Sequence, residues 1–133
     1  MDTMAKHLET GEWGEGQAER YLRGQGMKIL GRRVRFGPRE ELDLVARDKD
    51  VLVFIEVKTR RAEAFGRPIH SVDQHKRDVL SRAAVHYLKK IGFKPVHFRF
   101  DVVEVLGEMG DDAPEIRHVP NVFTLARRYQ LPF

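Results

Sequence analysis

The sequence predicts an α/β fold in which helices flank a mixed β-sheet, with the elements in the order α-β-β-β-α-β-β. Residues 11–23 and 71–88 repeat apolar side chains at the spacing of an amphipathic helix. Residues 40–58 hold two runs rich in Val, Leu, Ile and Phe on either side of the polar "RDKD", which is typical of a β-hairpin. Residues 96–106, "VHFRFDVVEVL", have the composition of a long strand.

The composition is that of an ordinary globular domain. The 133 residues suffice for one hydrophobic core, so we expect a single domain over 1–133 with flexible tails at 1–10 and 127–133. The absence of cysteine excludes disulfides and thiolate metal sites, and the six histidines lack zinc-site spacing. No apolar run approaches the ~18 residues of a membrane span, and the first residues lack the apolar core of a secretory signal. We therefore expect a soluble, cytoplasmic protein that has no membrane partner.

The first helix is expected at residues 11–23, with Thr10 as its N-cap. Gly24 and Gly26 end this helix, and residues 27–36 are expected to form the first strand. Three glutamates recur at three- and four-residue spacing and therefore share a stripe of the helix: Glu12, Glu15 and Glu19.

The second strand of the hairpin carries charges inside an apolar run. Side chains alternate between the two faces of a strand, so Glu56 and Lys58 share a face with Leu52 and Phe54. Buried charges are costly unless they are paired or bound to a ligand. This strand therefore either holds its charges on a solvated face or exists to present them.

The first strand of the hairpin brings a further carboxylate near these charges. A turn centred on Asp48 and Lys49 would set Asp43 opposite Phe54. Asp43 and Glu56 would then be diagonal neighbours, ~7–8 Å apart on one face. Alternation along this strand predicts two sets of residues on opposite faces: Glu41, Asp43 and Val45 on one, and Leu42, Leu44 and Ala46 on the other.

The second half of the chain continues the alternation of helix and strand. Ser71 and Gln74 have the spacing of a capping box at the start of the second helix. Lys76 falls on or beside the apolar stripe of that helix, where its stem covers apolar surface or its ammonium contacts substrate. Residues 115–119 are expected to form a short edge strand, and residues 121–133 a short terminal helix or a tail.

Charge is segregated along the chain. Residues 58–94 contain ten Lys or Arg and three acids, a net charge of +7, whereas residues 101–115 contain six acids and no Lys or Arg. Asp101 within that acidic segment is expected to pair with Arg99 or a nearby backbone group. Such segregation either presents a positive face to a polyanion such as nucleic acid or reflects solvated helices and loops. A second basic cluster consists of Arg32, Arg33 and Arg35.

Asp43, Glu56 and Lys58 have the chemistry of a phosphodiester-cleaving site. Two neighbouring carboxylates repel each other when both are ionised, unless a proton or a divalent cation lies between them. Oxygen ligands suit Mg²⁺ or Mn²⁺, which polarise a phosphate and lower the pKa of an attacking water, and the Val57 carbonyl is a further candidate ligand. Lys58 would either orient that water or stabilise the charge that develops on the phosphate. The structural alternative is an exposed cross-strand ion pair.

These residues resemble the PD-(D/E)xK nuclease superfamily, which includes restriction endonucleases and archaeal-type Holliday junction resolvases. More closely, the chain is similar to the YraN-like family of predicted bacterial endonucleases. The family commonly has Gly-Glu-Ile-Asp where this chain has the residues 40–43, "EELD". The matching segments span roughly residues 11–105 and are, in order, "GEWGEGQAERYL", "ELDLVARDKDVLVFIEVKTRR", "AFGRPIHSVDQHK" and "RFDVVEV".

The resemblance implies a restriction-endonuclease-like fold, with Asp43 and Glu56 as metal ligands and Lys58 as the catalytic lysine. In related resolvases a glutamate of the first helix approaches the site. Glu15 or Glu19 matches it here, with Glu15 preferred, and a solvated helix face is the alternative for both.

The activity implied is that of a Mg²⁺- or Mn²⁺-dependent endonuclease acting on DNA, with branched or structured DNA as the expected substrate. Several resolvases work as dimers, so a homodimer is a further expectation. A non-catalytic nucleic-acid-binding module of the same fold and a protein-interaction adaptor are the alternatives. The residues expected to contact nucleic acid are Arg60, Arg61, Arg67 and Lys76.

Overall fold

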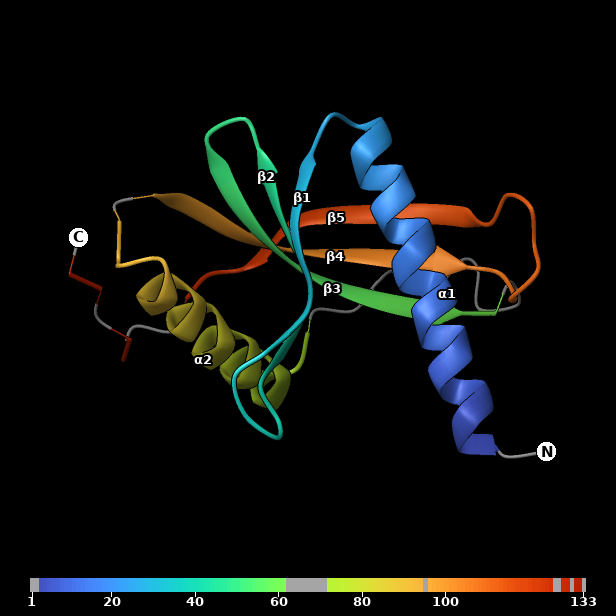
Figure 1. Ribbon diagram of the computed structural model, residues 1–133, viewed down its shortest axis with the longest axis horizontal. Coiled ribbons are helices and arrows are strands. Elements are labelled where there is room, and N and C mark those ends of the chain that lie inside the picture. Colours follow the sequence, from blue (N-terminus) through green and yellow to red (C-terminus); the bar gives the residue numbers. More distant parts are fainter. Residues whose placement is uncertain (1–2, 62–71, 95, 126–127, 130, 133) are drawn as a thin grey trace.

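The computed structural model describes residues 3–61, 72–94, 96–125, 128–129 and 131–132, with side chains described from residue 8 onward. Its helices and strands follow the predicted order, and the predicted mixed α/β fold is confirmed (Figure 1). The elements are α1 (Thr3–Gly24), β1 (Lys28–Arg35), β2 (Glu41–Asp48), β3 (Val51–Arg60), α2 (Gln74–Lys90), β4 (His97–Leu106) and β5 (Glu115–Phe123).

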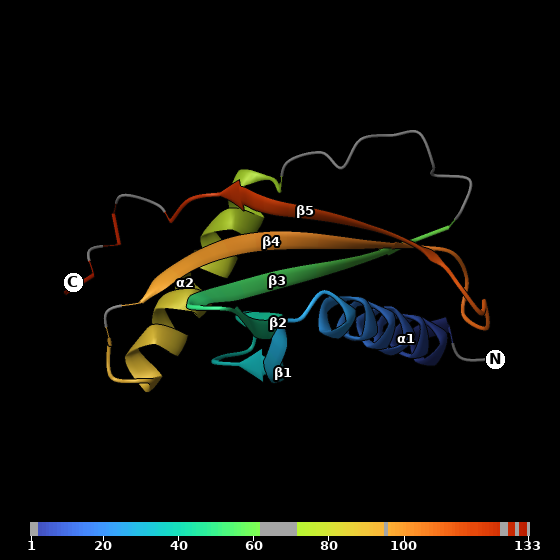
Figure 2. The same cartoon turned by 90° about the horizontal axis from the view of Figure 1, so that it is seen from above.

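The strands form one mixed sheet in the order β1-β2-β3-β4-β5. The pairs β1–β2, β2–β3 and β4–β5 are antiparallel, whereas β3 and β4 run parallel. Parallel neighbours require a crossover connection, and α2 lies between β3 and β4 in the chain. The two helices lie at separate positions along the twisted sheet, as the two views in Figures 1 and 2 show.

The core has two parts, one on each face of the sheet. Leu52 and Phe54 of β3 belong to the part that contains the apolar side chains of α2, whereas Val53 and Ile55 belong to the part that contains Ala18 and Leu22 of α1. The predicted alternation along β3 is therefore confirmed. Glu56 and Lys58, which continue the series of Leu52 and Phe54, are placed on the α2 face.

The alternation predicted for β2 is wrong at its first residues. Leu42 and Val45 pack in the α2 part of the core, whereas Leu44 and Ala46 pack in the α1 part. Strict alternation would have put Leu42 with Leu44. The alternation of side chains between the two faces of the sheet is therefore interrupted at Asp43, between Leu42 and Leu44.

Both helices begin at residues other than those predicted. α1 begins at Thr3, so residues 3–10 are helical rather than a tail and Thr10 is not the N-cap. Residues 4–9 contain no Gly or Pro, and the helix tolerates Gly11 at the modest cost of a glycine in a helix interior. α2 begins at Gln74, and Asp73 is its N-cap because the Asp73 carboxylate accepts a hydrogen bond of 2.8 Å from the Lys76 N–H. Ser71, the predicted cap, lies outside the described residues.

The C-terminal strand is longer than predicted. β5 continues to Phe123, so residues 121–123 are extended rather than helical. The Phe123 ring stacks on Phe100 of β4 at a centroid distance of 4.3 Å, which favours the extended path because it buries both rings. Neither helix in the described part of the chain is long and apolar enough to cross a membrane.

Candidate active site

The turn of the β2–β3 hairpin lies one residue later than predicted. Asp48 pairs with Val51, so the turn consists of Lys49 and Asp50. Lys49 has a φ of 55°, a left-handed conformation that the favoured two-residue hairpin turns require. Because the turn moves by one residue, the register of the whole hairpin moves by two.

This register sets the two candidate acidic residues at opposing positions of the hairpin. Leu44 and Ile55 are the last paired residues of the β2–β3 ladder, and the next residue along each strand is Asp43 or Glu56. Asp43 was predicted to lie opposite Phe54 and diagonal to Glu56, and that geometry is wrong. The structure places Asp43 and Glu56 opposite each other where the ladder ends.

The Asp43 side chain takes the place of a backbone partner at this point. The Val57 N–H donates a hydrogen bond of 2.8 Å to Oδ2 of Asp43. In an antiparallel pair the N–H and C=O of one residue face the same neighbouring strand. The Val57 carbonyl therefore faces the β2 side of β3, the side on which the Asp43 carboxylate lies.

The surroundings of the two carboxylates raise the pKa of both groups. Burial, followed by the negative charge of Glu56, raises the pKa of Asp43 to about 7. Burial also raises the pKa of Glu56, although the ammonium of Lys76 opposes that rise. The Glu56 side chain is 12% exposed, and its buried Oε2 has no hydrogen-bond partner among the residues that the structure describes. The pair is therefore suited to a cation or a shared proton.

Two lysines approach Glu56 from different elements. Lys76 of α2 places its Nζ 3.5 Å from Oε1 of Glu56. Lys58 follows Glu56 by two residues on the same face of β3, and its positive charge also lowers the pKa of Glu56. Lys58 makes no ion pair with any residue that the structure describes. Sequence reasoning missed the contact between Lys76 and Glu56, because nothing in the residue pattern set the position of the α2 N-terminus relative to β3.

A glycine brings α1 close to the end of β3. A Cβ atom on Gly14 would overlap the Thr59 hydroxyl oxygen, so the helix backbone lies directly against the Thr59 side chain. Only a glycine allows this approach. The next residue of the helix is Glu15, whose negative charge contributes to the raised pKa of Asp43.

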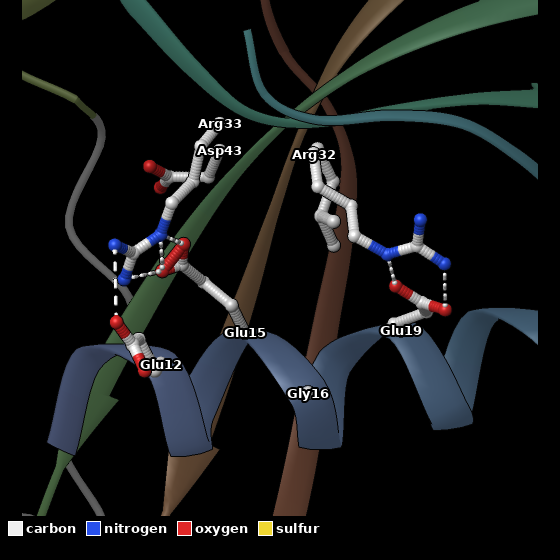
Figure 3. Close-up of a pocket in the computed structure, with 8 residues that line it drawn as sticks. Glu12, Glu15, Gly16, Glu19, Arg32, Arg33 and Asp43 are labelled. Atoms are coloured by element: carbon white, nitrogen blue, oxygen red, sulfur yellow. Dashed lines mark hydrogen bonds and ion pairs between the residues drawn. The ribbon is translucent and has the colours of Figure 1, made fainter. Parts of the chain in front are cut away.

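The glutamates of α1 meet the arginines of β1 beside Asp43 (Figure 3). Glu15 accepts from the Arg33 guanidinium at 2.8 and 3.0 Å, and Glu19 accepts from Arg32 at 2.5 and 2.7 Å. The Arg32 hydrogen bond, which outweighs burial, lowers the pKa of Glu19 to about 2. A cavity of about 240 Å³ borders these ion pairs and Asp43. Of the two predicted glutamates, Glu15 is the one whose charge acts on Asp43.

The three arginines predicted to contact nucleic acid differ in their surroundings. Arg60 pairs with the fully buried Glu104 at 3.2 Å, which gives Arg60 a structural partner. Arg61 is exposed, and Arg67 lies outside the described residues.

Two further predictions concerned charged residues outside the site. Asp101 accepts hydrogen bonds from Arg99, as predicted, and also contacts His118 at 2.7 Å. Each arginine of the cluster predicted on the first strand has an acidic partner: Arg32 with Glu19, Arg33 with Glu15 and Arg35 with Glu41.

Glu40 occupies the position at which the YraN-like family commonly has glycine. Its carboxylate contacts Nδ1 of His86 at 2.6 Å and Nε of Arg82 at 3.5 Å, so it ties the start of β2 to α2. Glu40 does not belong to the described residues with positive φ. The backbone before Asp43 therefore does not require a glycine in this chain.

The described residues include no group of three or more Asp, Glu or His side chains arranged around one metal position. A cation at this site would therefore be held by Asp43 and Glu56, with the Val57 carbonyl as a backbone ligand. Mg²⁺ is commonly bound by one or two carboxylates and retains several waters. The orphaned Oε2 of Glu56 and the raised pKa of Asp43 fit such an ion.

Comparison with known proteins identifies the family. The model described as "Uncharacterised protein family UPF0102" matches residues 14–105, which include Asp43, Glu56, Lys58 and Lys76. The chain belongs to the UPF0102 family. The resemblance to the YraN-like family, which is the same family, is thereby confirmed.

Relatives from several bacteria share most of the chain with this UPF0102 member. A UPF0102 protein of Syntrophotalea carbinolica is 46% identical over 118 residues, which cover 89% of this chain and 94% of the relative. A UPF0102 protein of Geobacter sulfurreducens is 42% identical over 115 residues, covering 85% and 87%. A UPF0102 protein of Clostridium acetobutylicum is 34% identical over 119 residues, covering 88% and 95%. These relatives are named by family membership alone.

Proposed function

We propose that this UPF0102 protein is a Mg²⁺-dependent endonuclease, also active with Mn²⁺, that hydrolyses phosphodiester bonds in DNA. The observation that carries the proposal is the opposition of Asp43 and Glu56 at the end of the β2–β3 ladder. The pKa of Asp43 is raised to about 7, and one buried oxygen of Glu56 has no hydrogen-bond partner in the described part of the chain. Two partly buried carboxylates near each other lower the stability of the folded protein. Such acids with raised pKa values are characteristic of functional sites.

The proposed roles follow from the positions of the side chains. Asp43, Glu56 and the Val57 carbonyl hold the cation, which supplies Lewis acidity toward the phosphate and the attacking water. Lys58 projects from the same face as Glu56 and stabilises the negative charge that develops on the phosphate oxygens. Glu15 is close enough to influence Asp43 and helps to complete the acidic side of the site.

The preference for branched or structured DNA rests on the resemblance to Holliday junction resolvases, as does the proposed homodimer. Among the basic residues expected to contact DNA, Lys76 lies at the site and Arg61 is exposed next to the end of β3. Arg60 is paired with Glu104 and contributes charge near the strand end rather than a free guanidinium. The lack of cysteine fits a cytoplasmic location.

The proposal is tested by cleavage of a DNA panel that includes four-way junctions, flaps, single strands and linear duplex, with Mg²⁺ or Mn²⁺. We expect the wild type to cut at least one branched substrate, and Asp43→Asn, Glu56→Gln and Lys58→Met to lose more than ~100-fold in rate. Lys90→Met, at the exposed far end of α2, is the matched control for charge removal and should cut at the wild-type rate.

Two outcomes would contradict the proposal. Equal residual cleavage by the wild type and the three site variants would identify a contaminating nuclease. Binding of DNA by a correctly folded wild type that cuts no member of the panel with either cation would favour the non-catalytic nucleic-acid-binding module.

A further inference from the structure

Lys76 is the residue of α2 that reaches the candidate site. It lies in the first turn of the helix, and its backbone N–H is fixed by a hydrogen bond of 2.8 Å to the Asp73 cap. From this anchored position its Nζ extends to 3.5 Å from Oε1 of Glu56. Glu56 belongs to β3, so the contact joins the N-terminal turn of α2 to the strand that carries Glu56 and Lys58.

The contact gives Glu56 its principal positive neighbour. Burial disfavours the ionised form of Glu56, and Lys76 is the strongest influence in the opposite direction, ahead of Lys58. No described residue, however, forms a hydrogen bond with Oε2 of Glu56. Lys76 therefore neutralises the carboxylate without saturating its oxygen atoms.

Lys76 is also free to leave this position. Its side chain is 41% exposed, whereas that of Glu56 is 12% exposed. The four-carbon stem of lysine has several low-energy rotamers, so the ammonium can move while the backbone stays capped. Glu56, in contrast, is held on a central strand of the sheet between β2 and β4.

A divalent cation on Asp43 and Glu56 would compete with this ammonium. Both are positive and both interact with the same carboxylate, and like charges at such separations repel strongly in a partly buried site. An ammonium displaced from Glu56 stays at the rim of the site because its helix position is fixed. Phosphate is the anion that a DNA substrate would bring there.

We propose that Lys76 is an exchangeable counter-ion of the active site. It neutralises Glu56 in the cation-free protein, and it transfers to a phosphate oxygen of the DNA when a divalent cation occupies the two carboxylates. The inference rests on the proposed function and adds a residue that links cation binding to substrate binding. Lys58 has a different role, since it makes no ion pair with the described residues and is not displaced by the cation.

The first measurement is calorimetric titration of Mn²⁺ into the DNA-free protein. Lys76→Gln removes the competing charge and is expected to bind Mn²⁺ about 5-fold more tightly than the wild type. Lys76→Arg retains the charge and should stay within about 2-fold of the wild type. Lys90→Gln removes one exposed charge from the other end of the same helix and is the matched control, with an unchanged isotherm expected.

The second measurement is junction binding in Ca²⁺, which takes the same kind of oxygen ligands. Lys76→Gln should bind a four-way DNA junction at least about 3-fold more weakly than the wild type, whereas Lys90→Gln should not. Tighter Mn²⁺ binding together with weaker junction binding in Lys76→Gln is expected if Lys76 moves between Glu56 and DNA. A lysine with only a structural role would not change the two affinities in opposite directions.

The outcomes separate this inference from the proposed function. If the wild type takes up no Mn²⁺, the proposed metal-dependent activity is overturned. If the wild type takes up Mn²⁺ but Lys76→Gln has the same Mn²⁺ affinity or the same junction affinity, the exchange role of Lys76 is overturned and the proposed function stands. A circular dichroism spectrum and an unfolding curve for each variant verify that it is folded.

Discussion

The backbone N–H of Val57 donates a 2.8 Å hydrogen bond to the carboxylate of Asp43 across the end of the β2–β3 hairpin. This bond replaces the strand-to-strand pairing that stops at Leu44 and Ile55. It holds the partly buried Asp43 carboxylate against β3, where the negative charge of Glu56 acts on it. The consequences of this arrangement for stability and activity can be measured.

The first prediction concerns stability in EDTA, without divalent cations. Burial and the charge of Glu56 raise the pKa of Asp43 from 3.8 to about 7. Between those values the folded protein binds more protons than the unfolded chain, so its stability falls as the pH rises. Asp43→Asn removes this titration while keeping an acceptor for Val57, and should be more stable than the wild type by ~1–3 kcal/mol at about pH 8.

Urea denaturation from about pH 5 to about pH 8 measures this effect. The advantage of Asp43→Asn should grow with pH, and Asp112→Asn, at an exposed loop position, should track the wild type. A difference between Asp43→Asn and wild type that is independent of pH would contradict the raised pKa. Added Mn²⁺ should stabilise the wild type more than Asp43→Asn.

The second prediction concerns the contact between α1 and β3. Gly14→Ala introduces a Cβ that overlaps the Thr59 hydroxyl oxygen, and the expected cost is ~1–3 kcal/mol of unfolding free energy. Gly16→Ala is the control in the same helix, because its Cβ would meet no atom of the described residues within 4 Å. That substitution should be neutral or stabilising, since alanine favours helix.

Thermal or urea unfolding of the two glycine variants gives the comparison. Adding Thr59→Ala to Gly14→Ala removes the overlapping hydroxyl and should restore part of the lost stability. Equal stability of Gly14→Ala and Gly16→Ala would show that the helix does not approach the strand as closely as described.

The third prediction separates the two glutamates of α1 in Figure 3. Glu15→Gln should slow DNA cleavage by about 10-fold or more, because Glu15 acts on Asp43. Glu19→Gln should leave the rate unchanged but lower the unfolding free energy by ~0.5–1 kcal/mol, because it weakens the pairs with Arg32 and Arg23. Single-turnover cleavage and urea denaturation report the two effects, and a reversed pattern would assign the site to Glu19.

The fourth prediction concerns the buried carboxylate of Asp101. Burial tends to raise its pKa, but hydrogen bonds from His118, Arg99 and the Asn121 N–H outweigh burial and leave the pKa below its usual value. The ionised group therefore stabilises the fold above about pH 4, the unfolded value, and this contribution is lost as the pH falls through the lower folded-state pKa. Asp101→Asn should cost ~2–4 kcal/mol near neutral pH.

Urea denaturation at neutral and acidic pH measures this prediction. The gap between wild type and Asp101→Asn should narrow below about pH 4, while Asp112→Asn again serves as the exposed control. DNA cleavage by Asp101→Asn should persist at temperatures at which the variant is folded, because Asp101 lies outside the proposed site. A constant gap at all pH values would contradict the lowered pKa.

The element order and the face of β3 that carries the charges were predictable because they depend on local periodicity. Alternation alone put Glu56 and Lys58 on the face of Leu52 and Phe54, and the contact of Glu56 with Lys76 of α2 agrees with this for Glu56. Asp43, one of three acids on β2, could be singled out by the Asp…Glu-x-Lys pattern of the superfamily that the sequence resembles. The residue opposite Asp43 could not be predicted. A two-residue turn can be placed at Asp48–Lys49 or at Lys49–Asp50, and each placement pairs different residues of the two strands.

The sequence by itself thus determined the α/β fold, the family and the presence of Glu56 and Lys58 on one strand. Only the tertiary structure decided which groups surround them. It set Asp43 opposite Glu56, brought Lys76 across from the crossover helix, and paired the arginines of β1 with the glutamates of α1. These contacts join residues that are distant in the chain, and their distances depend on how helices pack on the sheet, which no local pattern of residues encodes.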